Sequence, residues 1–168
     1  MAATITGKTR LLFVCNPNNP TGTMATKAEV AALMARVPDH VVVVFDEAYY
    51  EFSGITALPL IGRYRNLFVS RTCSKVYGMA AMRVGCLFSQ AENVAWLHKA
   101  QSPYSVNMPA AIAARAAIED KAYVDGYVRE VLEARERCYA GLERLGVKHW
   151  KSQGNFVLFV SPVAPKEL

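Results

Sequence analysis

Three short segments of the chain carry polar side chains of the kinds that bind a cofactor and act on it. They are residues 16–22 (NPNNPTG), 46–52 (DEAYYEF) and 70–83 (SRTCSKVYGMAAMR). Each of them follows or overlaps the end of a short apolar run that is typical of a buried strand. Because ligands of open parallel sheets bind at the carboxyl ends of the strands, we expect the three segments to meet at one edge of a sheet.

Together the segments offer a lysine amine, a carboxylate, a phenol, an amide, hydroxyls and a guanidinium. Such a set suits a cofactor that combines a phosphate ester with an aldehyde on a pyridine ring, because each of its polar groups needs a different partner. Pyridoxal 5'-phosphate is such a molecule. A lysine forms a Schiff base with its aldehyde, a carboxylate keeps its ring nitrogen protonated, and neutral and cationic donors hold its phenolic oxygen and phosphate. The candidates for these contacts are Lys75, Asp46, Tyr49, Asn19, Ser74 and Arg83.

In this order the three segments, with the third extended to SRTCSKVYGMAAMRVG, resemble the signature segments of class I and II aminotransferases of fold type I. The histidinol-phosphate aminotransferase branch of that family is the most similar, and the resemblance covers about residues 10–160. It implies that Lys75 is the catalytic residue, which binds pyridoxal 5'-phosphate covalently. It also implies that Asp46 contacts the pyridine nitrogen, and that Asn19 and Tyr49 contact the phenolic oxygen.

The same resemblance assigns the cofactor phosphate to residues near Lys75. Ser74 and Arg83 are the implied phosphate ligands, and Thr72 is a further candidate. Cys73 stands where the resembled enzymes usually have a bulky apolar residue, and it keeps the apolar character of that position. No metal is implied at this site.

Each segment also has a simpler interpretation. An NPxxP stretch can be only a turn, because proline and asparagine favour turns for backbone reasons. Asp46 could cap a helix, and Lys75 could be one of many surface lysines. Three segments in this order, each at a predicted strand end, favour the functional interpretation. His40, His98 and His149 lie outside the segments, and we expect surface or core roles for them.

The composition is that of one globular unit. The chain has 168 residues, of which 52% are hydrophobic and 20% charged, and its formal net charge is +5. No apolar run approaches the roughly 20 residues that span a membrane, and no secretory signal is recognisable, so we expect a soluble, cytoplasmic protein. Arginines and glutamates alternate between residues 129 and 144, which predicts a solvated helix face and no nucleic-acid partner.

The four cysteines, Cys15, Cys73, Cys86 and Cys138, are far apart and form no CxxC pair. Neither a zinc site nor a dense disulfide framework is therefore predicted. We expect buried free thiols.

Apolar runs predict the strands that must position the three segments. They span residues 10–15, 40–45, 66–70, 84–88 and 155–160. The second run is β-branched and apolar without alternation, as expected for a strand covered on both faces in a parallel sheet. With helices or loops between the runs, we expect an α/β fold with a mainly parallel sheet, which the resemblance identifies with the large-domain core of the family.

Helices are predicted at residues 26–36, 91–100 and 109–118, and a longer one follows. Thr26 and Glu29 form a capping-box pattern at the start of the first helix. Apolar residues recur at helical spacing from 124 to 145, and Gly146 is the predicted stop of the long helix.

The resemblance covers only the middle of such an enzyme. We expect residues 1–120 to be part of the large cofactor-binding domain, and residues 121–168 to be a linker helix and the truncated start of a small C-terminal domain. Residues 1–9 cannot supply the family's glycine-containing phosphate turn, and its carboxylate-binding arginine lies downstream of residues 155–160. We therefore expect an incomplete chain without appreciable turnover on its own.

By resemblance, the expected function is transfer of an amino group from L-histidinol phosphate to 2-oxoglutarate in histidine biosynthesis, with a homodimer as the full-length form. The expected partners are small molecules, an amino donor and a 2-oxo acid acceptor, and include neither nucleic acid nor a membrane. A threonine-phosphate decarboxylase or an aromatic aminotransferase would share every site residue named above. A non-catalytic domain of the same fold is the alternative from another class, and the retained Lys75 argues against it.

Overall fold

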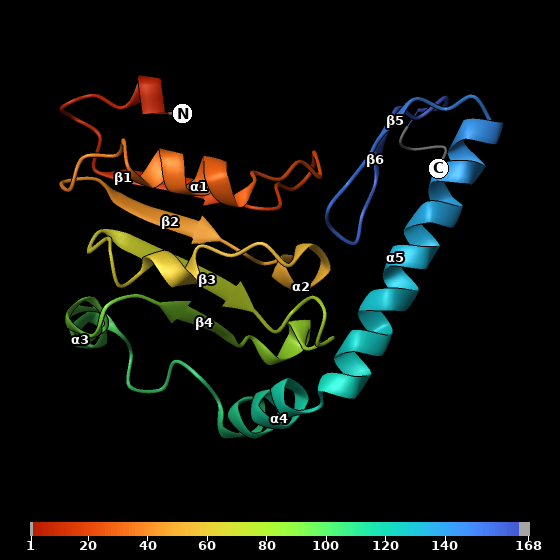
Figure 1. Cartoon of the computed structure of the whole chain (residues 1–168). Helices are drawn as coiled ribbons and strands as arrows, with labels where there is room; N and C mark the ends of the chain where they lie inside the picture. The colour runs from red at the N-terminus through yellow and green to blue at the C-terminus, as the bar shows by residue number, and fades with distance from the viewer. Residues whose placement is uncertain (1, 165–168) are drawn as a thin grey trace.

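The computed structural model describes residues 2–164, and its larger part is built on a four-stranded sheet. Strands β1 (Leu11–Cys15), β2 (Val42–Asp46), β3 (Leu67–Thr72) and β4 (Gly85–Phe88) lie side by side in that order (Figure 1). The first three strands are parallel, and β4 pairs antiparallel with β3. The predicted α/β fold with a mainly parallel sheet is confirmed.

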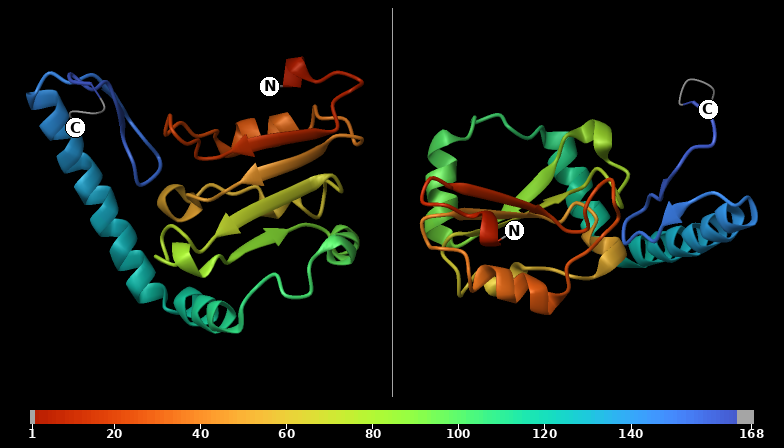
Figure 2. Two further views of the ribbon diagram at one scale, coloured as in Figure 1. Left: turned by 180° about the vertical axis from the view of Figure 1, so that it is seen from behind. Right: turned by 90° about the horizontal axis from the view of Figure 1, so that it is seen from above.

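Helix α1 (Lys27–Met34) covers one face of this sheet, and it lies on one side of the strands when the molecule is seen from above (Figure 2). The predicted capping box starts it, since Thr26 Oγ1 accepts from Glu29 N at 3.2 Å and Glu29 Oε2 accepts from Thr26 N at 2.8 Å. The core between helix and sheet consists of Val14, Val30, Met34, Val37, Val41, Val43, Phe45, Ala57, Leu67 and Val69.

The opposite face of the sheet is open in residues 2–164. Leu11, Phe13 and Leu87 are 49%, 62% and 45% exposed, and Val44 between them is only half-buried. The strand register places these side chains on the same face, because Phe13 pairs with Val44 and Leu87 pairs with Ser70, which itself pairs with Asp46 two residues after Val44. The expectation that β2 is covered on both faces is therefore wrong for the described part of the chain, in which α1 covers only one face.

Three longer helices follow the sheet. α3 (Ala91–Ala100) has the predicted bounds, and α4 (Met108–Glu119) is one residue longer at each end than predicted. α5 (Lys121–Arg144) is one continuous helix that runs past the ends of β1, β2 and β3 (Figure 1). The predicted stop is confirmed, because Gly146 has a φ of 66° and donates from its N–H to Glu143 O at 3.0 Å. The short helical turns are η1 (Ala2–Thr4), α2 (Tyr50–Ser53), η2 (Leu58–Leu60) and η3 (Ala80–Met82).

A small hairpin packs beside α5. Its strands, β5 (His149–Trp150) and β6 (Leu158–Phe159), are antiparallel and have two residues each. The predicted strand at 155–160 is thus much shorter than expected, because its partner strand does not continue. The register would place Gln153 opposite Asn155, but Gln153 donates its N–H to Gly22 O at 2.8 Å instead. No helix of the described residues is long and apolar enough to cross a membrane.

All four cysteines are free thiols, as predicted, but only Cys73 is buried. Cys15, Cys86 and Cys138 are exposed, so the expectation of buried thiols is wrong for them. Cys15 follows the buried Val14 in a strand, and side chains alternate between the faces of a sheet, which places Cys15 on the open face.

Candidate functional site

The three polar segments leave the sheet at one edge, as their positions after strands predicted. Asp46, the last residue of β2, pairs with Cys15 of β1 and with Ser70 of β3. β3 continues to Thr72, two residues beyond the predicted end, because it pairs there with β4. The segment at 16–22 and the loop after β3 therefore lie on either side of Asp46.

Tyr49 is the residue at which side chains of all three segments meet. Asn19 Nδ2 donates to Tyr49 Oη at 2.9 Å, and Lys75 Nζ lies 5.4 Å from the centroid of the Tyr49 ring. Tyr49 is only 6% exposed, whereas Asn19 and Lys75 are exposed. The buried Tyr49 side chain thus contacts two exposed polar side chains, one from each neighbouring segment.

Asp46 is half-buried beside this cluster and makes one local contact, in which its Oδ1 accepts from Ala48 N at 3.1 Å. It does not cap the short helix α2, whose N-cap is Tyr49. A carboxylate can accept about four hydrogen bonds, so Asp46 keeps acceptor capacity for a ligand N–H. The simpler interpretation of Asp46 as a helix cap is thereby wrong.

The phosphate candidates are only partly brought together. Thr72 Oγ1 accepts from Ser74 N at 3.1 Å, and both residues are half-buried directly before Lys75. Arg83 is exposed, has a φ of 56°, and donates from Nη1 to Ala80 O at 2.8 Å. In residues 2–164 no contact joins Arg83 to Thr72 or Ser74, so its role as a phosphate ligand stays a prediction.

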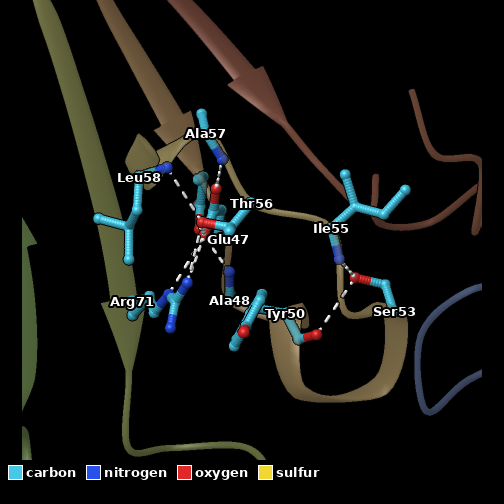
Figure 3. Close-up of polar contacts among 10 residues, drawn as sticks. Glu47, Ala48, Tyr50, Ser53, Ile55, Thr56, Ala57, Leu58 and Arg71 are labelled. Carbon is cyan, nitrogen blue, oxygen red and sulfur yellow. Dashed lines mark hydrogen bonds and ion pairs between the residues drawn. The ribbon is translucent and has the colours of Figure 1, made fainter. Parts of the chain in front are cut away.

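Two charged residues of the same segments were given no role by the sequence. Glu47 is buried next to Asp46, and Arg71 binds it through Nε at 3.1 Å and Nη2 at 3.0 Å (Figure 3). The position of Glu47 at the end of a buried strand could have indicated such a role, because a buried charge needs an oppositely charged or hydrogen-bonding partner.

Glu51 and Tyr77 lie beside this pair and line a cavity of about 140 Å³ that Arg71 and Cys73 also line. The pKa of the Glu51 carboxyl is raised above its ordinary value of 4.5, because the effect of burial is larger than the opposing effects of a backbone hydrogen bond and of the nearby Arg71 charge. Burial, and next the Glu51 charge, raise the pKa of Tyr77. Burial also raises the pKa of the Cys73 thiol, so this thiol is a poor nucleophile at neutral pH.

Residues 152–156, which follow α5, also contact the site, and the sequence did not predict this. The Phe156 ring meets the Tyr49 ring edge to face, with centroids 5.0 Å apart. Ser152 N donates to Tyr139 Oη at 2.7 Å, which fixes this stretch to α5, and its neighbour Gln153 binds the backbone of Gly22. The segment at 16–22 is thus held from a part of the chain more than 100 residues away.

Comparisons with known proteins identify the group to which this arrangement is similar. A family model described as aminotransferase class I and II matches residues 1–168. The histidinol-phosphate aminotransferase of Bdellovibrio bacteriovorus is 44% identical over 156 residues, which cover 89% of this chain and 42% of that protein.

Two solved structures are also similar. Histidinol-phosphate aminotransferase from Sinorhizobium meliloti, in complex with pyridoxal-5'-phosphate, superposes with a TM-score of 0.84 at 26% identity, covering 88% of this chain and 41% of that chain. Aspartate aminotransferase from Thermus thermophilus with maleate gives a TM-score of 0.82 at 27% identity, covering 98% and 46%. The chain spans less than half the length of each of these proteins.

Proposed function

The chain belongs to the class I and II aminotransferase family, and from this premise we propose that it binds pyridoxal 5'-phosphate through Lys75. We further propose that it is part of an enzyme that transfers an amino group from L-histidinol phosphate to 2-oxoglutarate. The observation that carries the proposal is the cluster of Asn19, Tyr49 and Lys75 at the sheet edge where β2 ends in Asp46. Each segment contributes a group that the cofactor requires.

The donors and acceptors of the cluster fit the cofactor group by group. Tyr49 Oη accepts a hydrogen bond from Asn19, and a phenolic hydroxyl can also donate one, in this case to the phenolic oxygen of the cofactor. Asp46 keeps acceptor capacity, and it would hold the proton on the ring nitrogen. Thr72 and Ser74 add hydroxyls for the phosphate beside Lys75.

When bound, pyridoxal 5'-phosphate supplies an aldehyde that takes up the amino group and a protonated ring that withdraws electrons from it. The chain's own contribution is to bind and orient. Lys75 is exposed, so its amine would be accessible to the aldehyde of a cofactor. The buried Tyr49 ring lies beside the Lys75 amine, and the Asp46 carboxylate would hold the proton on the ring nitrogen of a bound cofactor.

Cofactor binding through Lys75 can be tested without turnover. The purified chain is incubated with pyridoxal 5'-phosphate, its visible absorbance is recorded, and borohydride reduction followed by peptide mapping locates the labelled lysine. Lys75→Ala should abolish the reducible band, whereas Lys27→Ala, which removes an exposed lysine at the start of α1, should keep it. A reducible band that persists in Lys75→Ala would contradict the assignment.

The choice of amino donor rests on the relatives whose names specify histidinol phosphate. Titrating the cofactor-loaded chain with histidinol phosphate, threonine phosphate and an aromatic amino acid compares the three substrate classes directly. We expect the absorbance to respond at the lowest concentration of histidinol phosphate. A stronger response to either of the other compounds would reassign the substrate.

Two expectations about assembly stay predictions. The division after residue 120 falls at Asp120, where α4 ends and α5 begins, and the small hairpin packs on α5. The loop of the hairpin also contacts Tyr49 and Gly22 at the edge of the sheet. Limited proteolysis should then cleave near residues 119–121 first. The homodimer is expected from family resemblance, and sedimentation of the full-length enzyme would test it.

A further inference from the structure

Glu47 is a buried carboxylate that the proposed cofactor contacts do not use. Its side chain is 1% exposed, and an ionised carboxylate is kept in such a place only where it is paired and hydrogen-bonded. Figure 3 shows Glu47 between the arginine of β3 and the turn at residues 56–57. Its partners therefore come from two other parts of the chain.

Each oxygen of Glu47 has partners. Oε1 accepts from Ala57 N at 2.6 Å, and Oε2 accepts from Thr56 Oγ1 at 2.7 Å. Oε2 also accepts both bonds from Arg71, which in turn donates from Nη2 to Thr56 Oγ1 at 2.9 Å. The guanidinium carbon of Arg71 lies 3.5 Å from the centroid of the Tyr50 ring. Arg71 is thus fixed in direction as well as in charge.

This ion pair lies where the strand pairing of β2 and β3 ends. The last paired residues are Asp46 and Ser70, and one further backbone bond runs from Glu47 N to Ser70 O at 2.9 Å. Beyond that point the Glu47–Arg71 pair is a charged contact between the two chain segments, which the buried cluster of Tyr49, Phe52 and Val76 also joins. Glu47 directly follows Asp46, and Arg71 precedes Lys75 by four residues.

We propose that Glu47 and Arg71 are positioning residues, whose ion pair sets the spacing between the Asp46 carboxylate and the Lys75 amine. This inference rests on the proposed function, because the spacing matters only if both residues contact one cofactor. The alternative is that the pair only stabilises the fold. The two interpretations predict different cofactor affinities for a variant that lacks the pair but is as stable as the wild type.

A double variant separates them. Glu47→Gln or Arg71→Met alone leaves an unpaired buried charge, which destabilises a protein for reasons unrelated to the cofactor. The double variant Glu47→Gln/Arg71→Met removes both charges at similar side-chain size, and replacing a whole buried pair is often neutral for stability. Val30→Ala, in the α1 core, is the matched control for general destabilisation.

Two measurements are made on the wild type, the double variant and the control. The first is the dissociation constant of pyridoxal 5'-phosphate, with the position of its visible band. We expect the dissociation constant to be about tenfold higher in the double variant than in a control of equal urea midpoint. This factor corresponds to about 1.4 kcal/mol of binding free energy. Arg71→Lys keeps the charge and loses the two parallel donors, so it should give an intermediate value.

The second measurement is amide hydrogen exchange without cofactor. The amides of Glu47 and Cys73, which are bonded to Ser70 O and Val84 O, should exchange about tenfold faster in the double variant than in the control, by the same conversion. Equal affinity and equal exchange in the two proteins would overturn the inference. If the wild type binds no cofactor, the proposed function fails, and hydrogen exchange still decides whether the pair fixes the two strand ends.

Discussion

Replacing Gly22 by alanine should break the contact between the segment at 16–22 and residues 152–156. Gly22 has a φ of +70°, a left-handed conformation that costs alanine about 1 to 2 kcal/mol. A Cβ there would overlap Ser152 Oγ and lie 2.5 Å from Ser152 Cβ and 2.6 Å from its Cα. One backbone segment must then move, and losing the bond from Gln153 N to Gly22 O adds about 0.5 to 1.5 kcal/mol. The sum is a loss of about 1.5 to 3.5 kcal/mol in the free energy of unfolding.

Gly54 provides the matched control. It has the same φ of +70°, but a Cβ built on it would have nothing within 4 Å. Gly54→Ala should therefore lose only the backbone contribution, about 1 to 2 kcal/mol. Urea unfolding of both variants measures the difference, and exchange of the Gln153 amide reports the broken bond directly. Equal losses in the two variants, with Gln153 still protected, would refute the argument that residues 152–156 are packed against the cofactor segment.

Three further substitutions test the site. Asp46→Asn should weaken binding of pyridoxal 5'-phosphate about tenfold or more, because it replaces a charged hydrogen-bond acceptor worth about 1.5 to 3 kcal/mol, while the urea midpoint changes little; unchanged affinity would count against the ring-nitrogen contact. Arg83→Lys should also weaken binding about tenfold, since an ammonium cannot form two parallel bonds to phosphate, and equal affinity would indicate an ordinary surface arginine. Burial raises the pKa of Glu51, so its protonated form is favoured in the folded state, and this contribution to stability is present below pH 4.5 and is lost as pH rises through the folded pKa. Glu51→Gln should therefore match the wild type near pH 4 and become progressively more stable than it towards pH 8, and a difference in unfolding free energy that is the same at both pH values would contradict the assignment.

The sequence predicted best what depends on neighbouring residues. The capping box of Thr26 and Glu29 and the glycine stop at Gly146 are local signals, and the structure confirms both. The convergence of the three segments was also predictable, because it follows from placing each of them after a strand of one parallel sheet. The separate roles of Asp46 and Lys75 in cofactor binding stay predictions.

What could not be predicted depends on residues that are far apart in the chain. Glu47 pairs with Arg71, and Tyr49 packs on Phe156, yet neither spacing has a periodic signature. The strand expected at 155–160 was too long for a related reason, since its apolar pattern does not reveal that the adjoining backbone at Gln153 binds Gly22. Burial of Cys15 was mispredicted because the sequence does not specify which sheet face is covered. Cys86 and Cys138 are exposed for other reasons, since Cys86 lies in the edge strand β4 and Cys138 in the helix α5.

Tyr49 touches Asn19, Lys75 and Phe156 at once, and this has a thermodynamic consequence. A molecule that binds at Lys75 and needs the Tyr49 ring in its present orientation binds better when Phe156 is docked against that ring. Linkage is reciprocal, so the bound molecule must favour docking of Phe156 by the same free energy. Adding ligand should therefore slow the opening of the hairpin beside α5, even where the hairpin itself does not bind the ligand.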